Sequence, residues 1–245
     1  MPARLLLIED DVSIARFVEL ALEELPRHDP AAPAVELHTA VDLVGARAAL
    51  AAGGWQLVIT DLMLADGSSE ALLAEGHALA AGAPPWVVFS AGLHQSRHDA
   101  LARLGVACLL RKPASLVDLL DLVARLLRPG ADAAPRQEPA GSDPVQQHFG
   151  GDRALYDVFR AGCIARFADD IAQGQAALAA ADVHGLRRVA HGLKAVLVLI
   201  GQPDLAARAL ALEVAATDWT PGAPLPTGWP ALADGLAALQ MPAAG

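Results

Sequence analysis

Residues 4–128 alternate short apolar runs with longer segments of helical periodicity, and this alternation limits the folds open to them. The runs of strand length are RLLLI (4–8), AVELHT (34–39), WQLVIT (55–60), WVVFS (86–90) and VACLL (106–110). The candidate helices lie near 12–25, 41–52, 69–81, 96–104 and 115–127. Continuous apolar strands separated by helices are typical of a parallel sheet covered on both faces. We therefore predict an α/β fold, a five-stranded doubly wound parallel sheet.

The rest of the chain has a different pattern. The stretch RPGADAAPRQEPAGSDP (128–144) is dense in Pro, Gly, Ala and charge and has no hydrophobic period, so we predict a linker over 129–144. Beyond it, a period near 3.6 recurs around 152–180, 182–200, 203–216 and 230–239. We predict two domains, the first over 1–128 and an all-α four-helix bundle over 145–245.

Charge and hydropathy exclude several classes of partner. The net charge is -10 and the pI is about 5.1, without a local basic stripe, so we expect no nucleic-acid binding. Only four consecutive apolar residues precede the first acids, and no apolar run reaches the roughly 18 residues of a membrane span. We expect a soluble, cytoplasmic protein that does not bind membranes.

The side chains best suited to chemistry stand directly after the predicted strands. They are Glu9, Asp10 and Asp11 after the first strand, Asp61 after the third, Ser90 after the fourth and Lys112 after the fifth. Ligands of doubly wound sheets bind at these carboxyl ends. Clustered carboxylates repel one another, and Mg²⁺ with waters and phosphate oxygens is the usual compensation. An aspartate held by a metal and a lysine can be a phosphoryl-accepting nucleophile. Each residue alone is better explained as a helix cap, a turn or a surface charge, but their combination favours a site.

The motifs LLLIEDD, VITDLMLADG, FSA and LLRKP, in this order and spacing, resemble the receiver domain of two-component response regulators over 3–128. The resemblance implies that Asp61 is the phosphoacceptor and that Ser90 is the switch hydroxyl. It further implies that Lys112 contacts the phosphoryl group and precedes a cis bond to Pro113. The implied Mg²⁺ ligands are Asp10, Asp61, the backbone carbonyl of Met63 and, through water, Glu9. One position departs from the family: Leu109 replaces the usual aromatic residue three positions before the lysine.

A histidine and a lysine interrupt the apolar helix predicted over 182–200. On a helical wheel, the core stripe lies within about 60° of Leu193. It comprises Leu186, Val189, Leu193, Val196, Leu197 and Ile200. His191 lies about 160° from Leu193, which predicts that its imidazole faces solvent, beside Arg187, Arg188, Lys194 and Ala195. A solvated pair on an exposed face is the simpler interpretation. Against it, the chain has only two lysines, Lys112 and Lys194, and each lies at a candidate site.

Residues 145–240 resemble histidine phosphotransfer (Hpt) domains, most strongly at AHGLK (190–194). The resemblance implies a four-helix bundle in which His191 is the phosphoacceptor and Lys194 its electrostatic helper. Two positions depart from the family, because Ala195 replaces the usual glycine and Val196 a frequent small or hydroxyl residue. The other histidines show no metal-ligand spacing, and we predict them at the surface or in loops.

Together these features predict a phosphorelay protein. Asp61 would accept a phosphoryl group from a partner phosphohistidine, and His191 would exchange one with a receiver. The expected partners are a histidine kinase or other receiver or Hpt proteins. No segment resembles an ATP-binding kinase domain, so we expect no enzyme beyond slow self-dephosphorylation of the receiver. Alternatively, the helical domain docks on a histidine kinase as an inhibitor or adaptor without being phosphorylated. A metal-dependent phosphatase with Asp61 as its nucleophile is disfavoured, because it would carry a second aspartate two residues after Asp61, where this chain has Met63. The kinase, the recipient, the direction of flow, exchange within one chain and the oligomeric state stay open.

Overall fold

The computed structural model describes residues 1–91, 95–128 and 143–241 and divides into two compact units, Met1–Ala140 and Gly141–Gly245. Most of the predicted linker, 129–142, lies outside the described residues. Its last two residues, Asp143 and Pro144, cap and begin helix α6. In the part of the chain that is described, no helix combines the length and hydropathy needed to span a membrane.

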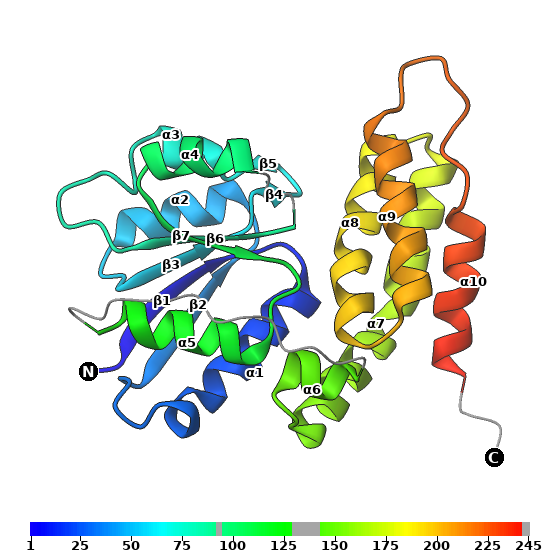
Figure 1. Cartoon of the computed structure of the whole chain (residues 1–245). Helices are drawn as coiled ribbons and strands as arrows, with labels where there is room; N and C mark the ends of the chain where they lie inside the picture. The colour runs from blue at the N-terminus through cyan, green and yellow to red at the C-terminus, as the bar shows by residue number, and fades with distance from the viewer. Residues whose placement is uncertain (92–94, 129–142, 242–245) are drawn as a thin grey trace. The chain divides into compact units, whose positions relative to one another are not determined.

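The first unit is built on a five-stranded parallel sheet in the order β2-β1-β3-β6-β7. Its strands are β1 (Ala3–Ile8), β2 (Val35–Ala40), β3 (Leu57–Thr60), β6 (Trp86–Ser90) and β7 (Val106–Arg111). Helices α1 (Val12–His28) and α5 (Leu116–Leu126) cover one face (Figure 1). Helices α2 (Leu43–Ala52), α3 (Glu70–Ala74) and α4 (Gln95–Arg103) cover the other. This strand order is that of flavodoxin-like doubly wound sheets, and it confirms the predicted α/β architecture.

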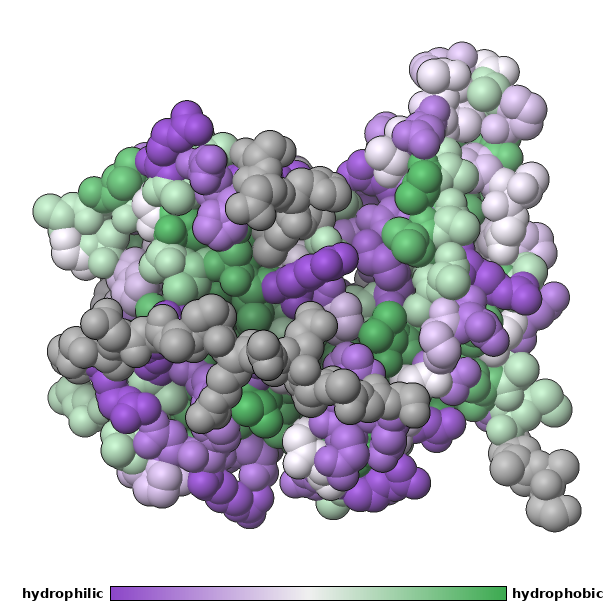
Figure 2. Space-filling model, in the orientation of Figure 1, coloured by the Kyte–Doolittle hydropathy of each residue, from purple (hydrophilic) through white to green (hydrophobic). Residues whose placement is uncertain are grey.

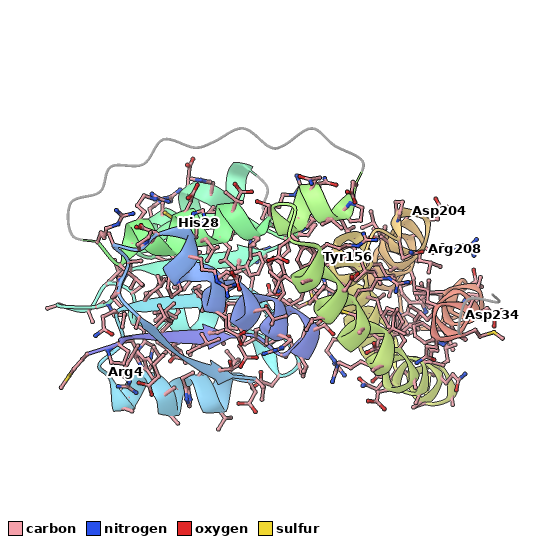
Figure 3. The ribbon with its side chains drawn as sticks, turned by 90° about the horizontal axis from the view of Figure 1, so that it is seen from below. Arg4, His28, Tyr156, Asp204, Arg208 and Asp234 are labelled. Carbon is pink, nitrogen blue, oxygen red and sulfur yellow. The ribbon has the colours of Figure 1, made fainter. Side chains whose placement is uncertain are left out.

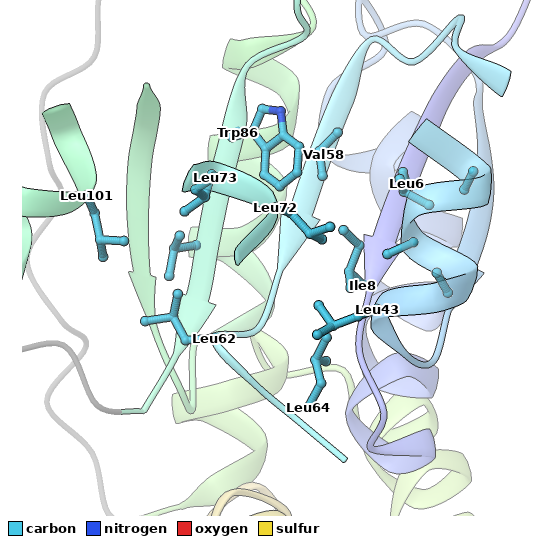
Figure 4. Close-up of a cluster of buried hydrophobic side chains, with 14 residues drawn as sticks. Leu6, Ile8, Leu43, Val58, Leu62, Leu64, Leu72, Leu73, Trp86 and Leu101 are labelled. Carbon is cyan, nitrogen blue, oxygen red and sulfur yellow. The ribbon is translucent and has the colours of Figure 1, made fainter. Parts of the chain in front are cut away.

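Apolar strands form the centre of this unit. Leu6, Ile8, Val58 and Trp86 from three adjacent strands are fully buried and belong to one hydrophobic cluster. Leu43, Leu72, Leu73 and Leu101 from the covering helices complete it (Figure 4). At roughly 25 cal/mol per Å² of apolar surface, such burial is the main stabilising contribution to this unit. Because helices cover both faces, the three central strands need no polar alternation, whereas the edge strand β2 alternates.

The loop after β3 differs from the prediction. Helix α3 ends at Ala74 rather than near residue 81, because Gly76 adopts a left-handed φ of 85° and the chain continues in turns. Ahead of it, β4 (Met63–Leu64) and β5 (Gly67–Ser68) form a small antiparallel hairpin that the alternation of apolar runs did not predict. Gly67 has a φ of 150°, which a residue with a Cβ rarely adopts.

The second unit consists of helices, α6 (Pro144–Phe149), α7 (Arg153–Ala179), α8 (Val183–Leu199), α9 (Pro203–Thr217) and α10 (Trp229–Gln240). Four of these confirm the predicted helices to within a residue or two at each end. Helix α8 packs against α7 and α9, and α10 packs against the same two helices (Figure 1). Asp152 and Asp182 cap α7 and α8 by accepting hydrogen bonds from backbone N–H groups.

Close packing determines the spacing of these helices. A Cβ at Gly174 of α7 would lie 1.9 Å from the Trp229 ring of α10, so only glycine lets the two helices approach this closely. The Tyr156 hydroxyl on α7 (Figure 3) donates to the carbonyl of Ile200 at 3.1 Å. Helix α6 packs on α7 and α8 and buries His148, which the sequence analysis wrongly placed at the surface. Burial lowers the pKa of His148.

Candidate functional site

The carboxyl ends of four neighbouring strands bring the predicted residues of the first unit to one edge. The backbone N–H of Asp61 donates to the carbonyl of Ile8 at 2.9 Å, which places Asp61 beside Glu9. The backbone N–H of Lys112 donates to the carbonyl of Ser90 at 3.1 Å. Parallel pairing of β3 with β1 and of β7 with β6 thus fixes both neighbours by main-chain geometry.

Lys112 links two acids at this edge. Its Nζ donates to Glu9 Oε2 at 2.5 Å and to Asp61 Oδ2 at 2.6 Å. The exposed fractions are 1% for Glu9, 1% for Asp61 and 5% for Lys112, so the contacts are shielded from water. The Lys112–Pro113 peptide bond is cis, as predicted. The structure thus brings together Glu9, Asp61 and Lys112, three of the predicted site residues.

The carboxyl groups at this edge outnumber the single ammonium group, and burial disfavours their ionised forms. Burial raises the pKa of Glu9 to about 8, although Lys112 partly offsets the effect. Burial also raises the pKa of Asp10. For Lys112, burial disfavours the charged form, but the charges of Asp61 and Glu9 prevail and hold its pKa above the ordinary value. Lys112 therefore stays charged, and Glu9 and Asp61 share its ammonium group.

Hydrogen bonds that the sequence pattern did not predict fix the backbone around Asp61. Its carbonyl accepts from Thr60 Oγ1 at 2.8 Å and from Ser69 Oγ at 2.5 Å. The Asp66 carboxylate accepts from the backbone N–H of Leu43 at 2.9 Å, which ties the hairpin to the start of α2. The dipeptide Asp66–Gly67 is a turn signal that could have revealed the hairpin.

Asp11 has the simpler of its two predicted roles. Its carboxylate accepts hydrogen bonds from the backbone N–H groups of Ser13 and Ile14 at 2.8 and 3.1 Å. It is therefore the N-cap of α1. The acids left to face a ligand at this edge are Glu9, Asp10 and Asp61.

In the second unit, His191 and Lys194 share one carboxylate from the neighbouring helix. His191 Nδ1 lies 2.6 Å from Glu213 Oε1, and Lys194 Nζ donates to Glu213 Oε2 at 2.6 Å. Burial raises the pKa of Glu213, but the hydrogen bonds from His191 and Lys194 outweigh it and bring the pKa to about 2. Glu213 is therefore ionised at neutral pH.

The predicted exposure of His191 is only partly right. Its side chain is 13% exposed and that of Lys194 19%, and Ala195, predicted on the outer face, is buried. The helical wheel considered α8 alone, whereas α7 and α9 both pack against it. The core stripe itself is confirmed, because all its members are buried except Val189, which is half-buried.

Glu213 is the functional candidate that sequence reasoning missed. It lies on another helix, so no spacing within residues 182–200 points to it. One signal was available, because Glu213 is the only glutamate in residues 141–245.

Leu210 and Val214, within a turn of Glu213 on α9, are exposed, and Figure 2 shows hydrophobic residues gathered over this helix.

No family model and no curated protein matches the chain in sequence. Solved structures of response regulator receiver domains resemble it over about half its length. A two-component response regulator from Clostridium difficile is 19% identical, with 52% of this chain and 97% of that chain covered and a TM-score of 0.45. The chemotaxis response regulator CheY4 of Vibrio cholerae is 18% identical, with coverages of 52% and 100% and a TM-score of 0.44. The Mn²⁺-bound form of response regulator Rcp1 is 25% identical, with coverages of 54% and 100% and a TM-score of 0.42.

The donor set at the acidic edge is compatible with a hard divalent cation. Within 1–91, 95–128 and 143–241, no three His, Cys, Asp or Glu side chains are grouped as a metal site. Magnesium does not require such a group, because it usually binds one or two carboxylates and retains several waters. The acids at the edge offer oxygen donors and outnumber the single ammonium group, and both properties suit this ion.

Proposed function

We propose that this protein is a two-component phosphorelay protein with two phosphoryl acceptors, Asp61 and His191. It would act in the cytoplasm with a histidine kinase, or with other receiver or Hpt proteins, and without nucleic acid or membrane. One observation carries the proposal: the buried Lys112 ammonium holds Asp61 at 2.6 Å among further acids at the carboxyl edge of a parallel sheet. This arrangement suits a carboxylate that takes up a phosphoryl group.

At the first site, an Asp61 oxygen would form the new P–O bond while the P–N bond of a partner's phosphohistidine breaks and its imidazole leaves. Lys112 would move from Asp61 Oδ2 to a phosphoryl oxygen and neutralise charge there. The hydroxyl of Ser90, at the end of β6, would hydrogen-bond another phosphoryl oxygen. Thr60 and Ser69 hold the Asp61 backbone during the exchange.

Mg²⁺ is the proposed cofactor of the first site. Asp10, Asp61 and the backbone carbonyl of Met63 would hold it, with Glu9 acting through water. When bound, the ion supplies positive charge that offsets the repulsion between the acids and the phosphoryl group. The placement of two buried carboxyl groups, Glu9 and Asp61, around the single Lys112 ammonium supports this assignment.

At the second site, we propose that α7, α8, α9 and α10 form an Hpt-type four-helix bundle with His191 as its acceptor. The pairwise packing of these helices supports the bundle. Lys194, one turn from His191, would provide positive charge for a phosphoryl group on the imidazole. The protein would have no kinase activity of its own, and slow self-dephosphorylation of the receiver is the only turnover that we expect.

Chemical donors test both acceptors without the partner kinase. The full chain would be treated with acetyl phosphate and Mg²⁺, or with phosphoramidate. An alkali-labile acyl phosphate should form at Asp61 and disappear in Asp61→Asn. An acid-labile, alkali-stable phosphoryl group should form at His191 and disappear in His191→Gln. Labelling that persists in these variants would overturn the assignment of the acceptors.

The alternative function, a phosphorylation-gated module whose helical unit only docks on a kinase, has one observation in its favour. His191 is largely covered. Ala195 and Val196, the two positions at which this sequence departs from Hpt domains, are buried. This alternative predicts an acyl phosphate on Asp61 but no acid-labile phosphoryl group on the second unit. The labelling experiment therefore separates the two functions directly.

A further inference from the structure

The aromatic ring of Phe89 lies against the ammonium group of Lys112. Lys112 Nζ stands over the ring, 5.1 Å from its centroid. Strand pairing brings the two residues together, because Phe89 of β6 is in register with Leu110 of β7, two residues before the lysine. Phe89 is 1% exposed and Lys112 5%, so the contact is shielded from water.

The ring gives Lys112 an attraction that an aliphatic side chain lacks. The face of an aromatic ring carries partial negative charge and attracts a cation within about 6 Å of its centroid, most strongly where water is excluded. An ammonium group has three N–H donors. Two of them donate to Glu9 Oε2 and Asp61 Oδ2 at 2.5 and 2.6 Å, and the third is able to point to the ring. Leu or Val would fill the core at position 89 equally well, but only an aromatic residue also attracts the cation.

The attraction to the ring depends less on direction than the two hydrogen bonds do. When Asp61 takes up a phosphoryl group, Lys112 exchanges Asp61 Oδ2 for a phosphoryl oxygen. The hydrogen bond to Asp61 breaks in this movement, whereas an ammonium group that turns above a ring face stays attracted to it. The ring is therefore able to hold the ammonium group in place before, during and after the exchange.

We propose that Phe89 is a positioning residue whose ring keeps the Lys112 ammonium beside Asp61 while the phosphoryl group is transferred. This inference rests on the proposed function. With acetyl phosphate as the donor, the new P–O bond forms to an Asp61 oxygen while the P–O bond to the acetyl group breaks and acetate leaves. The Phe89 ring makes no bond in this step and acts through Lys112 alone.

The contact is measured by NMR of the full chain without any phosphoryl donor. The chain contains two lysines, so labelling with ¹³C-lysine gives ε-CH₂ signals from Lys112 and Lys194 only, and Lys194→Arg assigns them. We expect the ring current of Phe89 to shift the Lys112 ε-CH₂ protons upfield and this shift to disappear in Phe89→Leu. Phe167→Leu replaces a buried phenylalanine of the second unit and is the matched control, which should leave the Lys112 signals unchanged.

Fluorination separates the attraction to the cation from packing. Each fluorine withdraws negative charge from the ring face and nearly preserves its shape, so mono-, di- and trifluorophenylalanine at position 89 weaken the attraction in steps. The initial rate of acyl phosphate formation on Asp61, with acetyl phosphate and Mg²⁺, should fall with each fluorine. It should reach about a tenth of the wild-type rate with the trifluoro ring and in Phe89→Leu. The same series at position 167 should leave the rate unchanged.

The outcomes separate this inference from the proposed function. Wild-type Lys112 signals without an upfield shift, or equal rates across the fluorinated series at position 89, would overturn the positioning by Phe89. A slower reaction in Phe89→Leu alone, with a lower midpoint of urea unfolding, would overturn it too, because the ring would then act through packing. The expected upfield shift in a chain that forms no acyl phosphate would overturn the proposed function while supporting the contact between Phe89 and Lys112.

Discussion

In the first unit a lysine holds a candidate acceptor carboxylate, whereas in the second a carboxylate holds a candidate acceptor imidazole. Lys112, directly after β7, contacts Asp61, directly after β3. Glu9, Asp61 and Lys112 are each at most 5% exposed. Glu213 reaches His191 from the adjacent helix, and both side chains are 13% exposed. Each site thus pairs a carboxylate with a nitrogen-bearing side chain. The candidate acceptor is the carboxylate in the first site and the imidazole in the second, and the first pair is more deeply buried.

This difference teaches how each site depends on its fold. Backbone pairing between parallel strands places Asp61 beside Glu9, so the first site tolerates changes in distant side chains. In the second site, the distance between His191 and Glu213 is set by how closely α8 and α9 pack. The first site should therefore be sensitive to loss of charge, and the second to loss of helix packing.

The largest expected effect is that of Lys112→Met without divalent cations. It leaves Glu9 and Asp61 side by side with no buried cation, which should destabilise the first unit by about 3 kcal/mol. Lys194→Met is the matched variant at the shallower site and should cost less, about 1.5 kcal/mol in the second unit, because Glu213 keeps its contact with His191. Urea unfolding followed by hydrogen exchange of β1 and β3, or of α8, measures each unit separately. Equal costs for the two variants would contradict the difference in depth.

The second effect concerns helix packing. Gly174→Ala places a Cβ where the Trp229 ring lies, and the forced separation of α7 and α10 should cost about 1–3 kcal/mol. Gly162→Ala, on the same helix with no atom within 4 Å of its new Cβ, should instead stabilise the second unit by about 0.5–1 kcal/mol. Hydrogen exchange should show both changes in the second unit and none in β1 or β3. A similar response to both substitutions would mean that Trp229 does not limit the helix spacing.

The third effect is a loss of stability in acid that originates from Glu213. Its pKa falls from an ordinary 4.5 to about 2 in the folded chain, so its ionised form stabilises the folded state. This contribution is complete above pH 4.5 and is lost as the pH falls through about 2. Thermal unfolding of the second unit, measured at about pH 5 and about pH 3, should change more in the wild type than in Glu213→Gln. Equal pH dependence in both proteins would show that Glu213 is not stabilised by His191 and Lys194.

The comparison also shows how far sequence reasoning extends. Period and strand-end position predicted the doubly wound sheet, the four long helices and the approach of Lys112 to Asp61. These features depend on short-range pattern and on the geometry of parallel strands. The pairing of His191 with Glu213 depends instead on how two helices face each other, which a single helical wheel does not contain. The same limit explains the wrong prediction for Ala195.

The smallest expected effect tests the other end of the second unit, where α6 packs. His148 is buried there, and burial lowers its pKa below the ordinary value of 6.5. Below about pH 6.5 the unfolded chain binds the proton first, so acid favours unfolding. The stability of the second unit should decline from about pH 7.5 to about pH 5.5, and His148→Gln should flatten this decline. Hydrogen exchange of α7, corrected for its intrinsic pH dependence, measures it. An unchanged decline in the variant would assign the titration to another group, and β1 and β3 serve as the internal control because His148 belongs to the other unit.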